Sequence, residues 1–294
     1  MKKKNLTSRI EPYVWIAPSI ILMAIFILIP IFWVFKMSLS DVSKTGIIKG
    51  FAGLANFKKV LSGSTFGMVL KNTLVWTVAV VGLSTLLGFI LALILNNEFK
   101  GRKIARAIIV FPWATTLVIQ ASVWKFIFDT DYGTLNTLLM KLGIIHQAVN
   151  WTPTPAAWFA WEIACGIFVT IPFVCFTVLS GLQSIDNSYY EAATVDGAGY
   201  WSKLFKITLP LVKPSLTVST VLNIIYVFNS FPIVWTMTKG DPASRTDTLV
   251  TYLYKLAFYN GKQGQAAAVS VIGFLILLVC ASIYMVMTLR KGDE

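Results

Sequence analysis

Six long apolar segments, separated by shorter polar ones, dominate the pattern of the chain. Each has about the 20 apolar residues that an α-helix needs to cross the hydrocarbon core of a bilayer. The segments span residues 14–35, 74–95, 107–124, 163–182, 215–238 and 266–289. Because lipid offers no hydrogen-bond partner to a free backbone N–H or C=O, each segment is expected to be helical. The pattern therefore predicts an all-α integral membrane protein with six transmembrane helices.

The composition supports the same class. Of the 294 residues, 56% are hydrophobic and only 13% are charged, against roughly 25% charged in an ordinary soluble domain. The net charge of +12 could indicate nucleic-acid binding, but the Lys and Arg residues are spread between the apolar segments rather than gathered in one patch. Such charges are typical of loops that face water and lipid head groups. We expect no nucleic-acid partner.

The first apolar segment follows a basic run, Lys2–Lys4, as the apolar part of a signal peptide would. However, its 22 residues exceed the roughly 7–15 of a usual signal-peptide core. The residues at its end, including Trp33 and Phe35, are bulky rather than the small ones of a cleavage site. We expect this segment to be retained as the first helix.

Orientation is predicted from the density of basic residues, because their totals on the two sides of the membrane are nearly equal. Four lie in the first nine positions, and four more lie in the short second connection: Lys100, Arg102, Lys103 and Arg106. Short loops and the first helix carry most weight in the positive-inside rule. Both termini are therefore expected to be cytoplasmic.

The cytoplasmic connection between the fourth and fifth segments, residues 183–213, is the most patterned polar part of the chain. Ser188 followed by Glu191 fits a capping box and predicts a helix start, and Gly197 predicts its end. A second short helix is expected to present one face and to end at Pro210; that face comprises Trp201, Leu204, Phe205 and Thr208. The pattern alone favours a loop lying on the membrane surface over a compact knob gripped by a partner.

The same connection closely resembles the EAA loop of ABC-importer permeases. The matching residues are Glu191, Ala192, Ala193, Asp196, Gly197, Ala198, Phe205, Ile207, Leu209 and Pro210. Similarity to the binding-protein-dependent sugar permeases, the maltose-permease-like group, extends over nearly the whole chain. It implies an ABC type-1 permease fold with a core at about 70–290, in a bacterial cell membrane, whose EAA residues couple to an ATPase.

The resemblance also implies partners. These are a second homologous permease, in a heterodimer, two ATP-binding subunits and an extracytoplasmic solute-binding protein. ATP and Mg would be bound by the partner subunits, because Gly261-Lys262 is followed by Gln263 and lacks the upstream glycine of a P-loop. The loop Lys239–Pro242 departs from the usual pattern of the group, and is expected to face the binding protein.

Polar residues in the fifth segment are candidates for the substrate pathway. Asn223, Tyr226 and Ser230 are spaced to share one helix face, with Asn229 beside them. The resemblance implies that positions matching Asn223, Ser230, Trp113 and Thr170 line a sugar site, and prolines beside the last two could unwind their helices near it: Pro112 and Pro172. Hydrogen bonding between helices remains an equally good explanation of the polar residues in the fifth segment.

No catalytic or metal site is expected. Glu162 is predicted to lie at the outer membrane interface and His146, the one histidine, in an exposed loop; the three cysteines lack metal spacing. A membrane enzyme is therefore disfavoured, and so is an ion-coupled secondary transporter, which would be expected to carry ionisable groups near mid-membrane.

The expected substrate is a di- or oligosaccharide. Glycerol phosphate is the main alternative, although a phosphate would favour Arg or Lys in the pathway.

Overall fold

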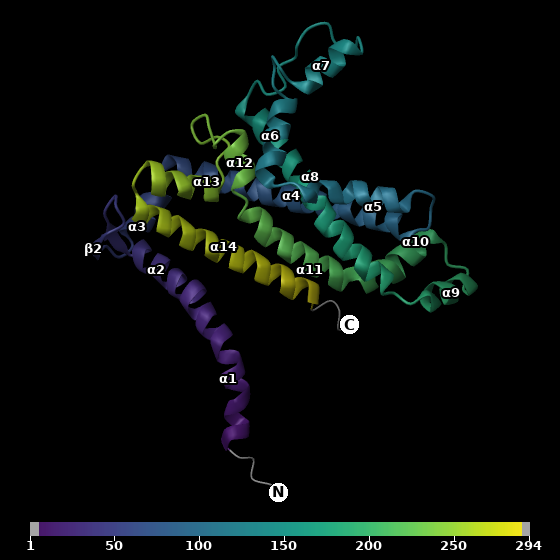
Figure 1. Ribbon diagram of the computed structural model, residues 1–294, viewed down its shortest axis with the longest axis horizontal. Helices are drawn as coiled ribbons and strands as arrows, with labels where there is room; N and C mark the ends of the chain where they lie inside the picture. The colour runs from purple at the N-terminus through teal and green to yellow at the C-terminus, as the bar shows by residue number, and fades with distance from the viewer. Residues whose placement is uncertain (1–5, 290–294) are drawn as a thin grey trace. The chain divides into compact units, whose positions relative to one another are not determined.

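The computed structural model describes residues 6–289, and within them the only regular structure other than helix is one short β-hairpin (Figure 1). Five helices in this part of the chain are long and apolar enough to cross a bilayer: Trp15–Ser38, Ser64–Asn96, Pro155–Gln183, Tyr200–Met237 and Gln263–Val286. The pair Arg102–Ala114 and Leu117–Ile127 forms a sixth span if it is counted as one broken helix. The prediction of an all-α membrane protein with six transmembrane helices is confirmed.

The chain forms two compact units. The first comprises the residues up to Gly63 together with Leu253–Phe274, and the second comprises Ser64–Tyr252 together with the residues from Leu275 onward. Whether the chain acts as a single transmembrane domain with a core at about 70–290 stays a prediction. The cytoplasmic placement of both termini also stays a prediction, and the basic run Lys2–Lys4 lies outside the described residues.

In the first unit, one apolar helix leads into a hairpin and a short helix. The side-chain amide of Asn56 donates to the carbonyl oxygens of Ser38 (3.0 Å) and Ser40 (2.8 Å), and so ties the short helix α3 to the end of α2. The elements are α1 (Leu6–Met23), the π-helical turn η1 (Ala24–Leu28), α2 (Ile29–Ser38), β1 (Ser40–Val42), β2 (Ile48–Phe51), α3 (Ala55–Leu61), the π-helical turn η4 (Lys255–Tyr259) and the first part of α14 (Gln263–Leu289). The two strands are antiparallel, with Ser40 opposite Phe51.

The second unit holds the other transmembrane helices. Its elements are α4 (Ser64–Asn96), α5 (Arg102–Val110), the 3-10 turn η2 (Phe111–Ala114), α6 (Leu117–Ile127), α7 (Thr134–Lys141), α8 (Pro155–Gln183), α9 (Asn187–Val195), α10 (Tyr200–Lys203), the π-helical turn η3 (Leu204–Thr208), α11 (Leu209–Phe228), α12 (Pro232–Met237), α13 (Leu249–Tyr254) and the end of α14.

The core of the second unit is the packing of α4 along α8, with α11 against both (Figure 1). Glycines permit this close approach. A Cβ built on Gly88 of α4 would lie 2.8 Å from the Cβ of Val174, and one on Gly166 of α8 would lie 2.9 Å from the ring of Trp76. Small residues of this kind are the usual means by which membrane helices approach each other, since lipid removes the hydrophobic drive for helix association.

Two of the predicted spans are not straight helices. The third was expected to run through 107–124, but it breaks between α5 and α6 with a bend of 98°. The fifth was expected at 215–238, but α11 begins earlier, at Leu209, and ends at Phe228, and three residues separate it from Pro232, which opens α12. Proline accounts for the position of both breaks, because Pro112 and Pro232 lack the N–H that a continuing helix needs.

We predict that Gly88→Leu disrupts the α4–α8 contact, because the new side chain would overlap Val174. Overpacking of this kind costs about 1–3 kcal/mol or more. The apparent Tm and the folded yield, measured by size-exclusion chromatography of the detergent-extracted protein after heating, should both fall. Gly82→Leu in the same helix is the control, since a Cβ there meets no atom within 4 Å; equal loss in both variants would contradict the packing argument.

Candidate functional site

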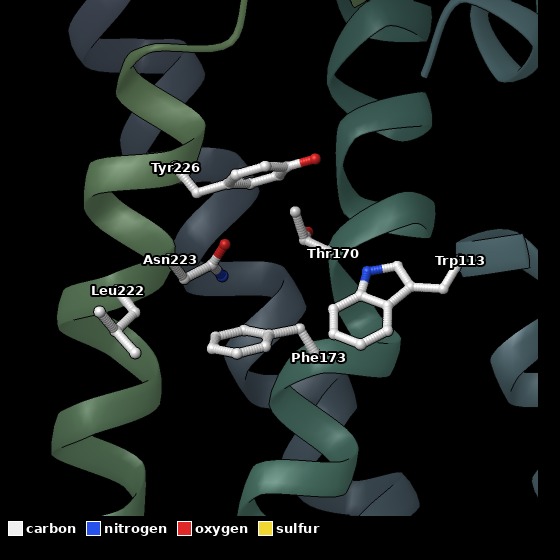
Figure 2. Close-up of a pocket in the computed structure, with 6 residues that line it drawn as sticks. All are labelled: Trp113, Thr170, Phe173, Leu222, Asn223 and Tyr226. Atoms are coloured by element: carbon white, nitrogen blue, oxygen red, sulfur yellow. The ribbon is translucent and has the colours of Figure 1, made fainter. Parts of the chain in front are cut away.

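A cavity of about 410 Å³ lies in the second unit, between α8, α11 and the 3-10 turn η2. This volume falls within the roughly 300–1,000 Å³ of small-molecule sites. Four of the six predicted pathway residues line it, and they come from three separate elements. The lining residues are Trp113, Thr170, Phe173, Leu222, Asn223 and Tyr226 (Figure 2).

Asn223 contributes to the cavity and to helix packing at once. Its Nδ2 donates to the hydroxyl of Ser84 on α4 (2.9 Å), so one side of the amide joins two helices. Its Oδ1 is buried and has no hydrogen-bond partner among the described residues, and in Figure 2 this oxygen is directed away from the nitrogen. The sequence left two interpretations of Asn223 open: hydrogen bonding between helices and lining of the pathway. The side-chain nitrogen supports the first, and the side-chain oxygen supports the second.

Aromatic rings supply most of the remaining wall. The rings of Trp113 and Phe173 lie 5.9 Å apart at an interplanar angle of 31°, and Tyr226 extends from α11 toward the same space (Figure 2). The hydroxyl of Thr170 donates to the carbonyl of Gly166 (2.8 Å) in its own helix, which leaves its oxygen as an acceptor. The cavity thus combines aromatic faces with a few hydrogen-bonding oxygens.

The break in the third span places Trp113 at the cavity. Its 3-10 turn ends at Thr115, which is extended, and Thr116 caps the next helix by accepting from the N–H of Ile119 (3.4 Å). The buried side chain of Gln120 donates to the carbonyl oxygen of Pro112 (3.0 Å) and also contacts the hydroxyl of Thr115. A break in a membrane helix frees backbone polar groups, and Gln120 satisfies part of them. At Pro172, by contrast, α8 continues, so the expected unwinding there is wrong.

The other two predicted pathway residues do not line this cavity. Asn229 is the C-cap of α11, and its exposed side chain donates to the carbonyl of Ile225 (2.8 Å). Ser230 is buried in the break between α11 and α12. Because α11 ends at Phe228, the helical spacing that placed Ser230 on the same face as Asn223 does not extend to it.

The predicted coupling segment, residues 183–213, begins differently from the predicted capping box. The N-cap of α9 is Asp186, whose carboxylate accepts from the N–H of Ser188 (2.8 Å). This hydrogen bond lowers the pKa of Asp186 below its ordinary value, because it stabilises the charged form. Ser188 therefore lies inside the helix, and its predicted role as the cap is wrong; the preference of Asp for N-cap positions could have identified the correct residue.

The end of α9 agrees with the prediction. Gly197 adopts a left-handed conformation (φ +76°), and the N–H of Ala198 donates to the carbonyl of Ala193 (2.8 Å), as in a Schellman motif. Glu191 and Ala192 are exposed on the helix, and Asp196 is its C-cap. Apolar side chains around them are also exposed: Tyr189, Val195, Tyr200, Trp201 and Phe205.

The second short helix of the coupling segment is not separate. Helix continues from Tyr200 through η3 into α11, so the prediction that Pro210 ends it is wrong. A π-helical turn at Leu204–Thr208 ends two residues before Pro210, and π-helical turns are one way in which a helix accommodates a local irregularity. The predicted single face is divided: Leu204 and Thr208 are buried, whereas Trp201 and Phe205 are exposed and stacked on each other.

Two side contacts hold α9 against this continuous helix. The hydroxyls of Tyr190 and Thr208 lie 3.0 Å apart, and Lys203 Nζ donates to the hydroxyl of Thr194 (2.7 Å). The coupling segment is thus attached to α8 at one end through Gln183 and to α11 at the other without interruption.

The burial of Glu162 was not predicted. It was expected at the outer membrane interface, which stays a prediction, but its side chain is 0% exposed and accepts a hydrogen bond from the hydroxyl of Thr238 (2.7 Å). His146 is exposed, as expected. Within residues 6–289, no group of three or more His, Cys, Asp or Glu is placed to hold a metal ion.

Several residues of the site had no signal in the sequence. Phe173, Leu222 and Ser84 are apolar or small residues in apolar segments, and nothing in their spacing separates them from ordinary lipid-facing or core positions. The nearest indication that Phe173 belongs to the cavity was its position directly after Pro172.

The comparison with protein families identifies the chain. The family described as "Binding-protein-dependent transport system inner membrane component" matches residues 84–290. The chain belongs to this family. It is therefore a multi-pass membrane permease subunit of an ABC transport system, and the resemblance drawn from the EAA loop is confirmed at that level.

Individual relatives cover nearly all of the permease. A probable ABC transporter permease protein of Brucella suis is 44% identical over 98% of this chain and 99% of its own length. The trehalose/maltose transport system permease protein MalF of Thermococcus litoralis is 34% identical over 96% of each chain. The crystal structure of a bacterial alginate ABC transporter, in complex with its alginate pentasaccharide-bound periplasmic protein, matches with a TM-score of 0.84 over 99% of each chain at 23% identity, which supports the fold.

We predict that Asp186→Ala loosens α9 in this permease, because the N–H of Ser188 loses its acceptor. Hydrogen exchange of a peptide covering 187–195, followed by mass spectrometry, should become faster, while a peptide from α8 should not change. Asp186→Asn is the control, since Asn also caps helices well. Equally slow exchange in Asp186→Ala and in the unsubstituted permease would contradict the assignment of the cap.

Proposed function

We propose that the permease imports a di- or oligosaccharide, and that the cavity lined by Trp113 and Asn223 is part of its pathway. A sugar ring presents an apolar face and a rim of hydroxyls. The aromatic rings of the cavity suit the face, and the free Oδ1 of Asn223 suits a hydroxyl donor. This unpaired buried oxygen is the observation that carries the proposal, because an acceptor without a donor is costly unless a ligand satisfies it.

The lining residues favour a sugar over glycerol phosphate. None of the six residues that line the cavity is Lys, Arg or His, and phosphate is usually bound by such groups. The names of some relatives state a sugar: trehalose and maltose for the Thermococcus litoralis protein, and alginate for a structural neighbour. We extend this substrate class to the present permease.

ATP-binding partners are proposed from the surface of the coupling segment. The side chain of Val195 is 88% exposed and that of Trp201 is 67% exposed, although both lie in a polar connection outside the bilayer spans expected from the sequence. A cluster of exposed apolar side chains on a water-facing segment is typical of a protein-binding surface. We infer that two ATP-binding subunits dock on this surface and on that of a second, homologous permease in the membrane.

An extracytoplasmic binding protein would deliver the sugar. The family description names binding-protein-dependent transport, and the alginate transporter was solved with its periplasmic protein. In this scheme, both termini and the EAA residues Glu191–Ala193 face the cytoplasm. Closure of the ATP-binding subunits moves α9, and the bundle then alternates between outward and inward access.

Reconstitution tests the proposal. The complex that co-purifies with the tagged permease is placed in liposomes, and uptake of labelled trehalose, maltose and an alginate trisaccharide is measured with and without ATP and with the binding protein encoded beside it. We expect uptake of at least one sugar to require both ATP and the binding protein. Uptake driven by an ion gradient without ATP would instead support a secondary transporter, and uptake of glycerol phosphate alone would replace the substrate class.

We predict that Glu191→Lys abolishes ATP-coupled uptake, because it reverses an exposed charge in the centre of the proposed docking surface. Membrane insertion should be intact, since α9 lies outside the transmembrane spans. Uptake at least tenfold below that of the unsubstituted permease is expected in proteoliposomes. Glu98→Lys, an exposed charge reversal in the connection after α4, is the control and should transport normally; normal uptake by Glu191→Lys would remove its coupling role.

We predict that Asn223→Leu weakens uptake more than Ser84→Ala does. Both substitutions remove the hydrogen bond between α4 and α11, but only the first removes the oxygen in the cavity. In Asn223→Leu, the apparent KM for the loaded binding protein should rise or the maximal rate should fall, at least fivefold. The ATP-binding subunits should still co-purify. Equal effects of the two substitutions would assign Asn223 to helix packing alone.

A further inference from the structure

Glu162 is a buried carboxylate that the proposed pathway does not use. It lies in α8 and has no exposed surface, and burial of a carboxylate in a membrane helix is costly without partners. Such residues usually serve transport or hold two elements together. Its position two turns from the outer end of α8 places it away from the six residues that line the cavity.

A directional chain of hydrogen bonds ends at Glu162. The hydroxyl of Thr238 donates to Glu162 Oε1 (2.7 Å) and lies 2.7 Å from the hydroxyl of Thr246. Since one hydroxyl carries one proton, Thr238 must accept from Thr246 when it donates to Glu162. It also accepts from the N–H of Gly240 (3.1 Å). We call these four residues the outer knot.

The loop closed by the outer knot is held independently at its far end by α4. The side-chain amide of Asn72 donates to the carbonyl of Arg245 (2.9 Å), and the hydroxyl of Thr73 accepts from the N–H of Leu249 (2.8 Å). Gly240 (φ +79°) has no room for a side chain, because a Cβ there would overlap the carboxylate of Asp247. Glu162 is thus a side-chain attachment of the near end of the loop, where α12 finishes.

Helix α12 connects the outer knot to the cavity. It follows the three-residue break after α11, the helix that carries Asn223 and Tyr226. On the inner side of the break, the indole N–H of Trp76 donates to the carbonyl of Val227 (2.9 Å). Helix α12 packs against α6 and α8, with Ile233, Val234 and Met237 buried in the core. Two side-chain hydrogen bonds add to this packing: one from Trp76 of α4 at the end of α11, and one to Glu162 of α8 at the end of α12.

Helix α8 runs without interruption from Glu162 to Gln183, where the coupling segment begins three residues before α9. A movement of α9 therefore reaches Glu162 along one helix. We propose that Glu162 is a positioning residue for transport: through Thr238 it makes α12, and with it the outer end of α11, follow the movement of α8. This role rests on the proposed function, since it concerns how ATP-driven movement reaches the cavity.

The test compares the amount of sugar transported per ATP hydrolysed. Complexes carrying Glu162→Leu, Glu162→Gln, Thr238→Val or Thr238→Ser are purified and reconstituted, and whichever of the three labelled sugars the unsubstituted complex takes up is the probe. We expect the ratio of sugar to ATP to fall at least threefold in Glu162→Leu and Thr238→Val. It should stay within twofold in Glu162→Gln and Thr238→Ser, which keep an acceptor and a donor, respectively.

The control is Thr177→Val in the same helix, whose hydroxyl donates to the carbonyl of Phe173 in its own helix (2.8 Å); its ratio should not change. An unchanged ratio of sugar to ATP in Glu162→Leu and Thr238→Val overturns the proposal. This holds even if less complex assembles, as long as the complex that does assemble has the unchanged ratio. Failure of both variants to assemble also counts against the proposal, because Glu162 and Thr238 would then have a purely structural role. Absence of ATP-driven uptake in the unsubstituted complex would instead refute the proposed function.

Discussion

The contact between α4 and α8 is the interaction on which the rest of the second unit depends. It is possible because glycines on both helices, Gly88 and Gly166, leave room for Val174 and Trp76. In a bilayer, apolar surfaces gain little by leaving lipid, so close packing and hydrogen bonds must supply the stability. The close contact also carries polar connections, because Ser84 on α4 lies where it can bind Asn223 of α11.

With this pair as a fixed support, two other spans can break without loss of the fold. A broken helix exposes backbone groups that the membrane cannot solvate. At the first break, Gln120 donates to the carbonyl of Pro112; at the second, Trp76 donates to the carbonyl of Val227. The two breaks shape the surroundings of the cavity. The first one directs Trp113 to the cavity, and the second one separates α11 from α12.

The sequence predicted the apolar spans, their number and the family, because these follow from long uninterrupted runs and from a fixed-gap motif around Glu191. It did not predict the bends, because hydropathy averages over a window and does not register a change of direction. It placed four cavity residues but not Phe173 or Ser84, whose roles arise only from contacts between helices. The burial of Glu162 was missed for the same reason, since its hydrogen-bond partner Thr238 is 76 residues away in the chain.

Continuity of helix decides how the coupling segment can act. In the proposed mechanism, the helix that runs from Tyr200 into α11 without a break would carry a movement of α9 toward the cavity. The helix passes Pro210 with a π-helical turn at Leu204–Thr208 shortly before it. The segment is thus joined to α8 on one side and to α11 on the other, and these are the two helices that supply Thr170 and Asn223 to opposite sides of the cavity. If α9 moves as proposed and tilts one helix relative to the other, the width of the cavity between them would change, as alternating access requires.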